Sequence, residues 1–164
     1  MNNTRMLQLE QHLDLLRQQQ ASLEKEAILL TGLPKTQAEQ RLELDVKPQI
    51  RKYEEEFWRI LAGEVKCLDI PEKEAEIVVA EIVEQVGQIE VSNTNYSDEI
   101  LKLLREIRDQ LNKPGSSAAA KLKGVISSVP PFFGISYEAE LDTENFFRSH
   151  FPTFTSLIRR TIKK

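Results

Sequence analysis

The sequence has little of what most catalytic and metal-binding sites are built from. Cysteine occurs once, as Cys67, which excludes an intrachain disulfide and a cysteine cluster for zinc. We expect Cys67 to be a buried structural thiol in a reducing compartment. The two histidines, His12 and His150, are expected on a helix surface and in a loop or cap. The six glycines form no phosphate-binding loop. We therefore predict no catalytic residue, no metal site and no cofactor, and we expect that the protein is not an enzyme.

Long hydrophobic runs are also missing. No stretch approaches the roughly 20 apolar residues that span a bilayer as a helix, and the polar residues 1–5 lack the apolar block of a signal peptide. The net charge of −4 gives no overall attraction for nucleic acid. We expect a cytoplasmic protein that binds no nucleic acid.

Charge is distributed unevenly along the chain. Residues 64–115 carry 6 Lys or Arg against 12 Asp or Glu, whereas residues 116–164 carry 7 against 4. The acidic middle and the basic end can attract each other, or each can face a different partner.

The most regular feature is an apolar pattern near the start of the chain. Its positions are separated alternately by three and four residues, which is the heptad spacing of a coiled coil. They are Met6, Leu9, Leu13, Leu16, Gln20, Leu23, Ala27 and Leu30. We predict that this seam mediates oligomerisation or partner binding. Gln20 is its only polar position, and either fixes the register of the seam or is exposed where the seam frays.

A second helix is expected after a turn at residues 31–34. Gly32 suits a left-handed residue after a helix, Pro34 blocks continuation, and Thr36 with Glu39 forms a capping box. Pro48 is expected to kink or split the second helix near Asp45, and the glutamates at 54–56 to face solvent. We predict an antiparallel helical hairpin, or coiled coil, over residues 1–63.

Residues 64–164 are predicted to form a compact helical domain with an aromatic-rich C-terminal segment. Helices are expected over 71–91 and 97–111, with a loop at 92–95 and a cap at Ser97. Later caps are expected at Ser116 or Ser117 and at Asp142 or Thr143. Stretch 65–70 is expected to be a linker or a minor strand, and a strand is the competing interpretation for 88–91. Pro130–Pro131 is expected to break the apolar stretch 125–137.

Residues 135–141 alternate strictly between apolar and polar, which predicts a half-buried strand. Its apolar face would hold Tyr137, with Ser136 on the opposite face. Glu138, Glu140 and Asp142 would then form a solvated row, a docking strip for the basic end, or a cation site. The predicted fold class is mainly α, with one or two short strands near 133–142.

Two stretches resemble a known group of proteins. Residues 9–61, LEQHLDLLRQQQASLEKEAILLTGLPKTQAEQRLELDVKPQIRKYEEEFWRIL, resemble the helical-hairpin modules attached to bacterial STAND (NACHT/NB-ARC-type) NTPases and caspase-like proteases. Residues 117–144, SAAAKLKGVISSVPPFFGISYEAELDTE, resemble a segment of the same conflict-signalling proteins. The resemblance implies a signalling accessory or adaptor. No NTP-binding or protease motif is present, so the chain would be a partner of such enzymes.

The end of the chain is predicted to form a short basic amphipathic helix. Its cations, the candidate contacts for a membrane or an acidic partner, are Arg159, Arg160, Lys163 and Lys164. We predict a protein–protein interaction module, an oligomerising adaptor in a bacterial STAND-type signalling or defence system. The alternative is a membrane-active effector that uses the apolar segment 124–137 and the basic helix. Membrane contact is not favoured, because the acidic middle of the same chain is nearer at hand.

Overall fold

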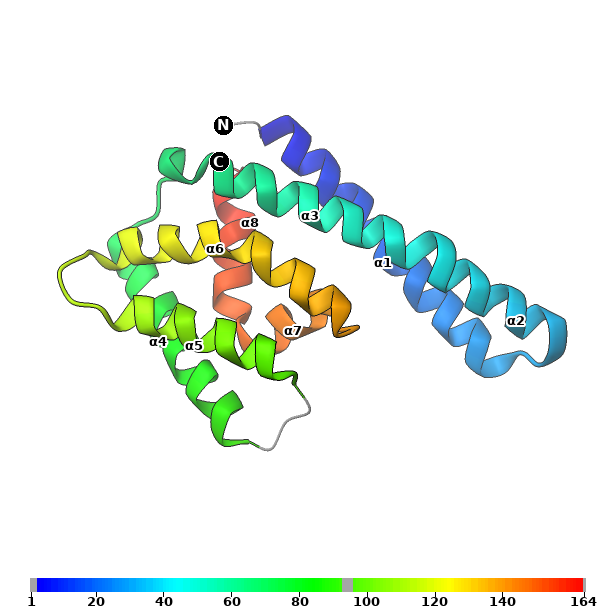
Figure 1. Ribbon diagram of the computed structural model, residues 1–164. Helices are drawn as coiled ribbons and strands as arrows, with labels where there is room; N and C mark the ends of the chain where they lie inside the picture. Colours follow the sequence, from blue (N-terminus) through cyan, green and yellow to red (C-terminus); the bar gives the residue numbers. More distant parts are fainter. Residues whose placement is uncertain (1–2, 93–95, 164) are drawn as a thin grey trace. The chain divides into compact units, whose positions relative to one another are not determined.

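The computed structural model describes residues 3–92 and 96–163, and within these ranges the regular structure is helical, without a strand (Figure 1). The mainly α fold class is therefore confirmed. The chain divides into two compact units, Asn2–Ile60 and Leu61–Lys164, named here the N-terminal unit and the C-terminal unit. The division falls inside one helix, close to the boundary expected at residue 63.

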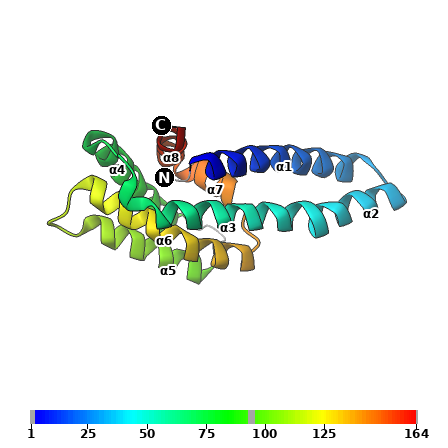
Figure 2. The ribbon, with the colours of Figure 1, turned by 90° about the horizontal axis from the view of Figure 1, so that it is seen from above.

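The N-terminal unit contains two antiparallel helical runs that lie side by side (Figures 1 and 2). The first is α1 (Asn3–Leu29), and the second consists of α2 (Gly32–Arg41), the π-helical segment η1 (Leu42–Val46) and most of α3 (Lys47–Gly63). Apolar side chains from both runs form one core. Its buried members are Leu13, Leu16, Leu23, Ala38, Leu42, Val46 and Ile50, with Ala27 and Tyr53 packed against them.

The turn between the two runs is tighter than expected. Gly32 has the expected left-handed backbone, with φ of +66°, but α2 begins at once and Thr31 is its N-cap. The predicted capping box is therefore wrong, and the hydroxyl of Thr36 instead donates to the carbonyl oxygen of Gly32 at 3.3 Å. Pro34 lies in the first turn of α2, where its missing N–H would have had no helical partner.

Pro48 does not split the second run near Asp45. The helix widens into η1 just before the proline, and the N–H of Lys47 donates to the carbonyl oxygen of Leu42, five residues back. This wider turn explains the spacing of the core, because Ala38, Leu42, Val46 and Ile50 recur every four residues. Steps of four drift around an α-helix of 3.6 residues per turn, and a π turn reduces that drift.

The C-terminal unit contains, in order, η2 (Val65–Cys67), α4 (Glu72–Val91), α5 (Asp98–Asn112), α6 (Ala118–Glu138), α7 (Thr143–His150) and α8 (Pro152–Lys163). Helices α4, α5 and α6 pack against one another, and α8 packs against α4 and α7. Aromatic rings fill much of the core between α6, α7 and α8, for example Phe132 on Phe146 at 5.6 Å and Phe147 on Phe154 at 6.3 Å between ring centroids.

The predicted cap at Ser97 is confirmed, and the two later caps fall on Ser117 and Asp142, each one of the two alternatives expected. The side chains of Ser97, Ser117 and Asp142 accept hydrogen bonds from the backbone N–H groups of Ile100, Ala120 and Asn145. The alternative strands at 65–70 and 88–91 are wrong, because the first contains η2 and the second ends α4. Of the expected loop at 92–95, residues 93–95 lie outside the described residues.

The predicted break at Pro130–Pro131 is also wrong, since α6 continues through both prolines. Each proline removes one backbone donor, and proline in a helix interior costs about 3 kcal/mol or more. Burial of the apolar stripe on α6 offsets this cost. The stripe consists of Leu122, Val125, Ile126, Val129, Phe132 and Phe133.

Residues 135–141 form the end of α6 and the turn after it, which overturns the predicted strand. Glu140 takes a left-handed conformation with φ of +55°, and the N–H of Leu141 donates to the carbonyl oxygen of Ser136 at 2.9 Å. This bond across the helix end is typical of a Schellman motif. Ser136 is buried, with its hydroxyl donating to Phe133 at 2.9 Å, and Tyr137 is half-buried. The two faces expected for the strand are thus reversed.

Candidate interaction surfaces

The seam predicted from the first helix packs largely within the chain. Met6, Leu9, Leu13, Leu16 and Leu23 are buried. The last three belong to the core shared with α2, η1 and α3, so their side chains are already covered inside the N-terminal unit. A partner would have to displace this packing to reach them.

The other three seam positions are more exposed. Ala27 is half-buried against the core, and Leu30 follows the end of α1 with 38% of its surface exposed. Gln20 is half-buried, and its amide nitrogen donates to the carboxylate of Glu24 on the same helix at 3.0 Å. The amide is thus paired within α1.

Two ion pairs join the helical runs of the N-terminal unit. Arg17 lies 2.9 Å from Glu54, whose side chain is 4% exposed, and Arg5 donates to both carboxylate oxygens of Glu56 at 2.7 and 3.0 Å. Arg5 lowers the pKa of the Glu56 carboxyl by hydrogen bonding. The expectation that residues 54–56 face solvent is wrong for Glu54, which is buried beside Arg17, whereas Glu55 and Glu56 are half-buried.

A compact apolar surface remains where α1 and α2 meet. Four large side chains within six consecutive positions are exposed there, namely Ile28 at 81%, Leu29 at 69%, Leu30 at 38% and Leu33 at 68%. We call these four residues the apolar tip. Single exposed leucines are common, whereas several exposed together make a candidate binding surface. The sequence signal for the apolar tip was the run of four consecutive apolar residues at 27–30. One buried face of a helix cannot hold four consecutive residues, so some of them had to be exposed.

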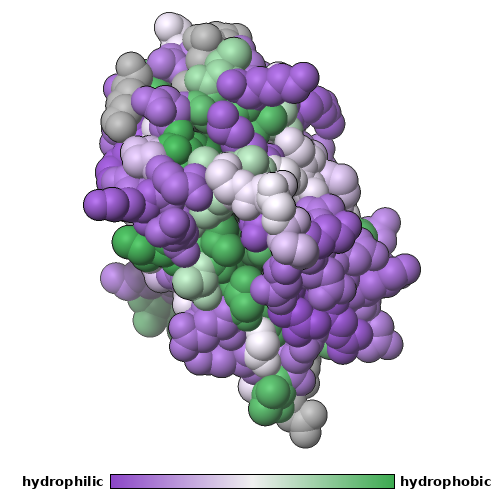
Figure 3. Space-filling model, turned by 90° about the vertical axis from the view of Figure 1, so that its left-hand side faces the viewer, coloured by the Kyte–Doolittle hydropathy of each residue, from purple (hydrophilic) through white to green (hydrophobic). Residues whose placement is uncertain are grey.

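Apolar side chains are also exposed on the C-terminal unit, for example Ile77 at 61% and Val91 at 89%. On the face drawn in Figure 3, apolar side chains gather in a strip bordered by hydrophilic ones. One hollow of this unit, of about 600 Å³, has Val79, Ala80 and Val83 of α4 in its lining. The lining also includes carboxylates, such as Glu76, and the amine of Lys121. Three carboxylates, Glu72, Glu76 and Glu84, outnumber the amine of Lys121, so the lining of this hollow has an excess of negative charge.

The carboxylates of α4 hold several other helices in place. Glu72 accepts the N–H groups of Ala118 and Ala119 at the start of α6, at 2.6 and 3.1 Å. Glu81 accepts those of Thr153 and Phe154 at the start of α8, both at 3.2 Å. Negative charge at a helix N-terminus is favourable because the unpaired N–H groups there point outward. The acidic middle of the chain therefore caps two later helices.

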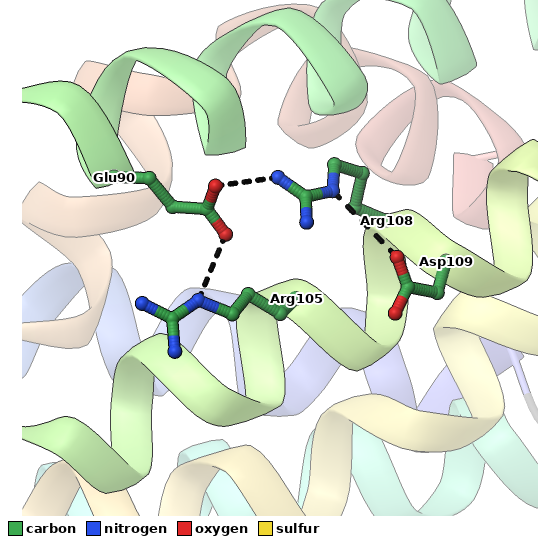
Figure 4. A network of polar contacts seen from close by, with 4 residues as sticks. All are labelled: Glu90, Arg105, Arg108 and Asp109. Atoms are coloured by element: carbon green, nitrogen blue, oxygen red, sulfur yellow. Dashed lines mark hydrogen bonds and ion pairs between the residues drawn. The ribbon is translucent and has the colours of Figure 1, made fainter.

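At the other end of α4, Glu90 binds two arginines of α5 (Figure 4). Arg108 lies 2.6 Å and Arg105 3.0 Å from its two oxygens, and Arg108 also approaches Asp109 at 3.7 Å. Hydrogen bonds from Arg108 and then Arg105 lower the pKa of Glu90. Arg105 and Arg108 are two of the six basic residues within 64–115, and in this network they join α5 to α4.

The basic residues predicted near the end of the chain lie on α8. Arg160 pairs with Glu74 of α4 at 2.9 Å, and Arg159 and Lys163 are exposed. Lys164 lies outside the described residues. The apolar side of the same helix, Phe154, Leu157, Ile158 and Ile162, is buried.

The remaining candidate side chains do not converge on a reaction centre. His12 is exposed beside Tyr53, with 5.6 Å between ring centroids. Cys67 is exposed, so the expectation of a buried thiol is wrong. Asp142 caps α7, and Glu138 and Glu140 are exposed. In the part of the chain that the structure describes, no group of three or more potential metal ligands comes together.

Comparison with known proteins adds no further assignment. A scan against models of protein families and searches of curated proteins and of solved structures found no match.

Proposed function

We propose that the protein is a protein–protein interaction module that self-associates through the apolar tip of a coiled-coil hairpin. The observation that carries this proposal is the exposure of Ile28, Leu29, Leu30 and Leu33 beside a core that is already filled. Burying such side chains stabilises a complex by about 25 cal/mol per Å² of apolar surface. A second copy is the simplest partner, because a two-fold dimer brings the same apolar patch of each subunit together.

The resemblance to hairpin modules of STAND NTPases and caspase-like proteases extends this proposal. In such a setting the chain is an oligomerising adaptor, and its association brings enzyme-bearing partners together. The membrane-active alternative is less favoured in this proposal. The apolar side chains of α6 and α8 on which it depends are buried, and no described helix is both long and apolar enough to cross a bilayer.

The test is the mass in solution, measured by light scattering after size exclusion in the presence of a reductant. The wild type is expected above the 18.9 kDa of one chain at micromolar concentration. Leu29→Ser with Leu33→Ser is expected to shift it to the monomer. The matched control is Leu15→Ser with Leu44→Ser, because these leucines of the same unit are similarly exposed, at 59% and 72%. Leu15 is about 20 Å along α1 from the tip, at 1.5 Å per residue.

A monomeric wild type, or equal effects of the two variants, would overturn self-association through the tip. Flotation with lipid vesicles provides a second check. Binding of the wild type to vesicles that is lost in the tip variant would identify the tip as a membrane contact and contradict the proposal.

A further inference from the structure

The second surface with a defined chemistry is a hollow between α7 and α8. It has a volume of about 290 Å³, and four cationic side chains line it: Arg148 of α7, and Arg159, Arg160 and Lys163 of α8. We call it the basic groove. Glu144 is the one carboxylate in its lining, so the groove has an excess of positive charge.

Existing ion pairs leave much of this charge accessible to solvent. Glu144 lies 3.9 Å from Arg148, whose side chain is 67% exposed. Glu74 lies 2.9 Å from Arg160, whose side chain is 52% exposed. Each guanidinium has five N–H donors, so an arginine that already binds one carboxylate can bind another.

The helix α8, which carries most of the groove, is fixed to the rest of the C-terminal unit. The apolar side of α8 is buried, its start is capped by Glu81, and Arg160 is paired with α4. The backbone that carries the cations of the groove is therefore held by packed helices, and binding has to order only the exposed side chains. With its apolar side buried, α8 also has no face left to insert into lipid.

We propose that the basic groove binds an acidic segment of a partner protein through the carboxylates of that segment. The size of the hollow suits a few side chains. The whole C-terminal unit also disfavours larger polyanions, because residues 61–164 carry 13 Lys or Arg against 16 Asp or Glu. The charge of the whole surface acts on a bilayer or a nucleic acid, because both are large. A short acidic segment interacts mainly with the charges nearest to it. This site is a surface distinct from the apolar tip and does not depend on self-association.

The experiment measures binding of a fluorescent, glutamate-rich peptide to the full chain by anisotropy. The groove variant is Arg148→Gln with Arg159→Gln and Lys163→Gln. The control, Lys66→Gln with Lys102→Gln and Lys113→Gln, removes the same charge at exposed positions of the same unit. We expect salt-sensitive binding by the wild type, about tenfold or more weakening in the groove variant, and less than about twofold in the control.

Three results would overturn the proposal: no binding by the wild type, equal weakening in both variants, or tighter groove-dependent binding of anionic vesicles or duplex DNA than of the peptide. Melting curves show whether the groove variant remains folded. If it does not, Lys163→Glu alone repeats the test, because Lys163 is exposed near the end of α8. The tip variant is expected to bind the peptide as the wild type does, so failure of one site is distinguishable from failure of the other.

Discussion

His150, at the end of α7, is held among aromatic rings. Its Nε2 lies 2.9 Å from the hydroxyl oxygen of Tyr96, and its ring centroid lies 4.8 Å from that of Phe146. Burial lowers the pKa of His150 below its ordinary value of about 6.5. Burial likewise raises the pKa of Tyr96, so both groups are expected to be neutral at neutral pH.

This arrangement predicts a loss of stability in mild acid. Below about pH 6.5 the unfolded chain binds a proton at His150 that the folded chain resists, so the free energy of unfolding decreases as the pH falls. Melting temperatures between about pH 7.5 and pH 5.5 should show this decrease, and His150→Gln should reduce it. His12→Gln is the control, because His12 is exposed. An unchanged pH dependence in the His150 variant would contradict the prediction.

Single residues also show where sequence reasoning succeeds. Ser97 was predictable as a cap, and Ser117 as one of two adjacent candidates, because a cap depends on neighbours within three residues. The burial of Glu54 was not predictable in the same way. It depends on Arg17, which is remote in sequence and lies on the other helical run, and only the fold brings the two side chains together.

Among the helices, α6 departs most from its sequence pattern. Strict alternation over 135–141 indicated a strand, but this span covers only the last helical turn and the reversal after it. The packing of Phe132 and Phe133 outweighs the local cost of Pro130 and Pro131, and such long-range packing leaves no signal in a short window. The longer periodic stretches that became α4 and α5 were predictable because several turns repeat the same stripe.

The course of α6 predicts that Pro131→Ala stabilises the protein. Pro131 is exposed inside the helix, where alanine is favoured by about 3 kcal/mol, and the greater freedom of the unfolded chain offsets up to about 1 kcal/mol of this gain. Urea unfolding should show a rise of about 2 kcal/mol. Pro114→Ala, between α5 and α6, is expected to lower the stability slightly. A similar fall for Pro131→Ala would show that the residue does not lie in a helix.

The chain as a whole uses its uneven charge internally. The acidic stretch 64–115 supplies the carboxylates that cap α6 and α8 and pair with Arg160 of α8. Composition allowed this outcome but did not distinguish it from two separate partners. The apolar tip was harder to predict. From the sequence, Leu29 could belong to a wider buried stripe on the first helix, but in the structure it lies exposed just before the turn at Gly32.

The attachment of α8 to α4 predicts a specific loss of stability. Glu81→Ala removes the acceptor of two backbone N–H groups at the start of α8 and should lower the free energy of unfolding by about 1 kcal/mol, as loss of a helix cap does. Glu76→Ala, at an exposed position of the same helix, should change it little. Chemical denaturation of both variants measures the difference. Equal losses would mean that the charge of α4 matters but the cap does not.

The exposed thiol of Cys67 has a practical consequence for handling the protein. In air, two chains can join through a disulfide at this position whether or not their apolar tips meet, because an accessible thiolate oxidises readily. Such covalent pairs would have twice the mass of one chain and would persist at any dilution. The same thiol, as the one cysteine in the sequence, also provides a single attachment point for a spin label or a fluorophore.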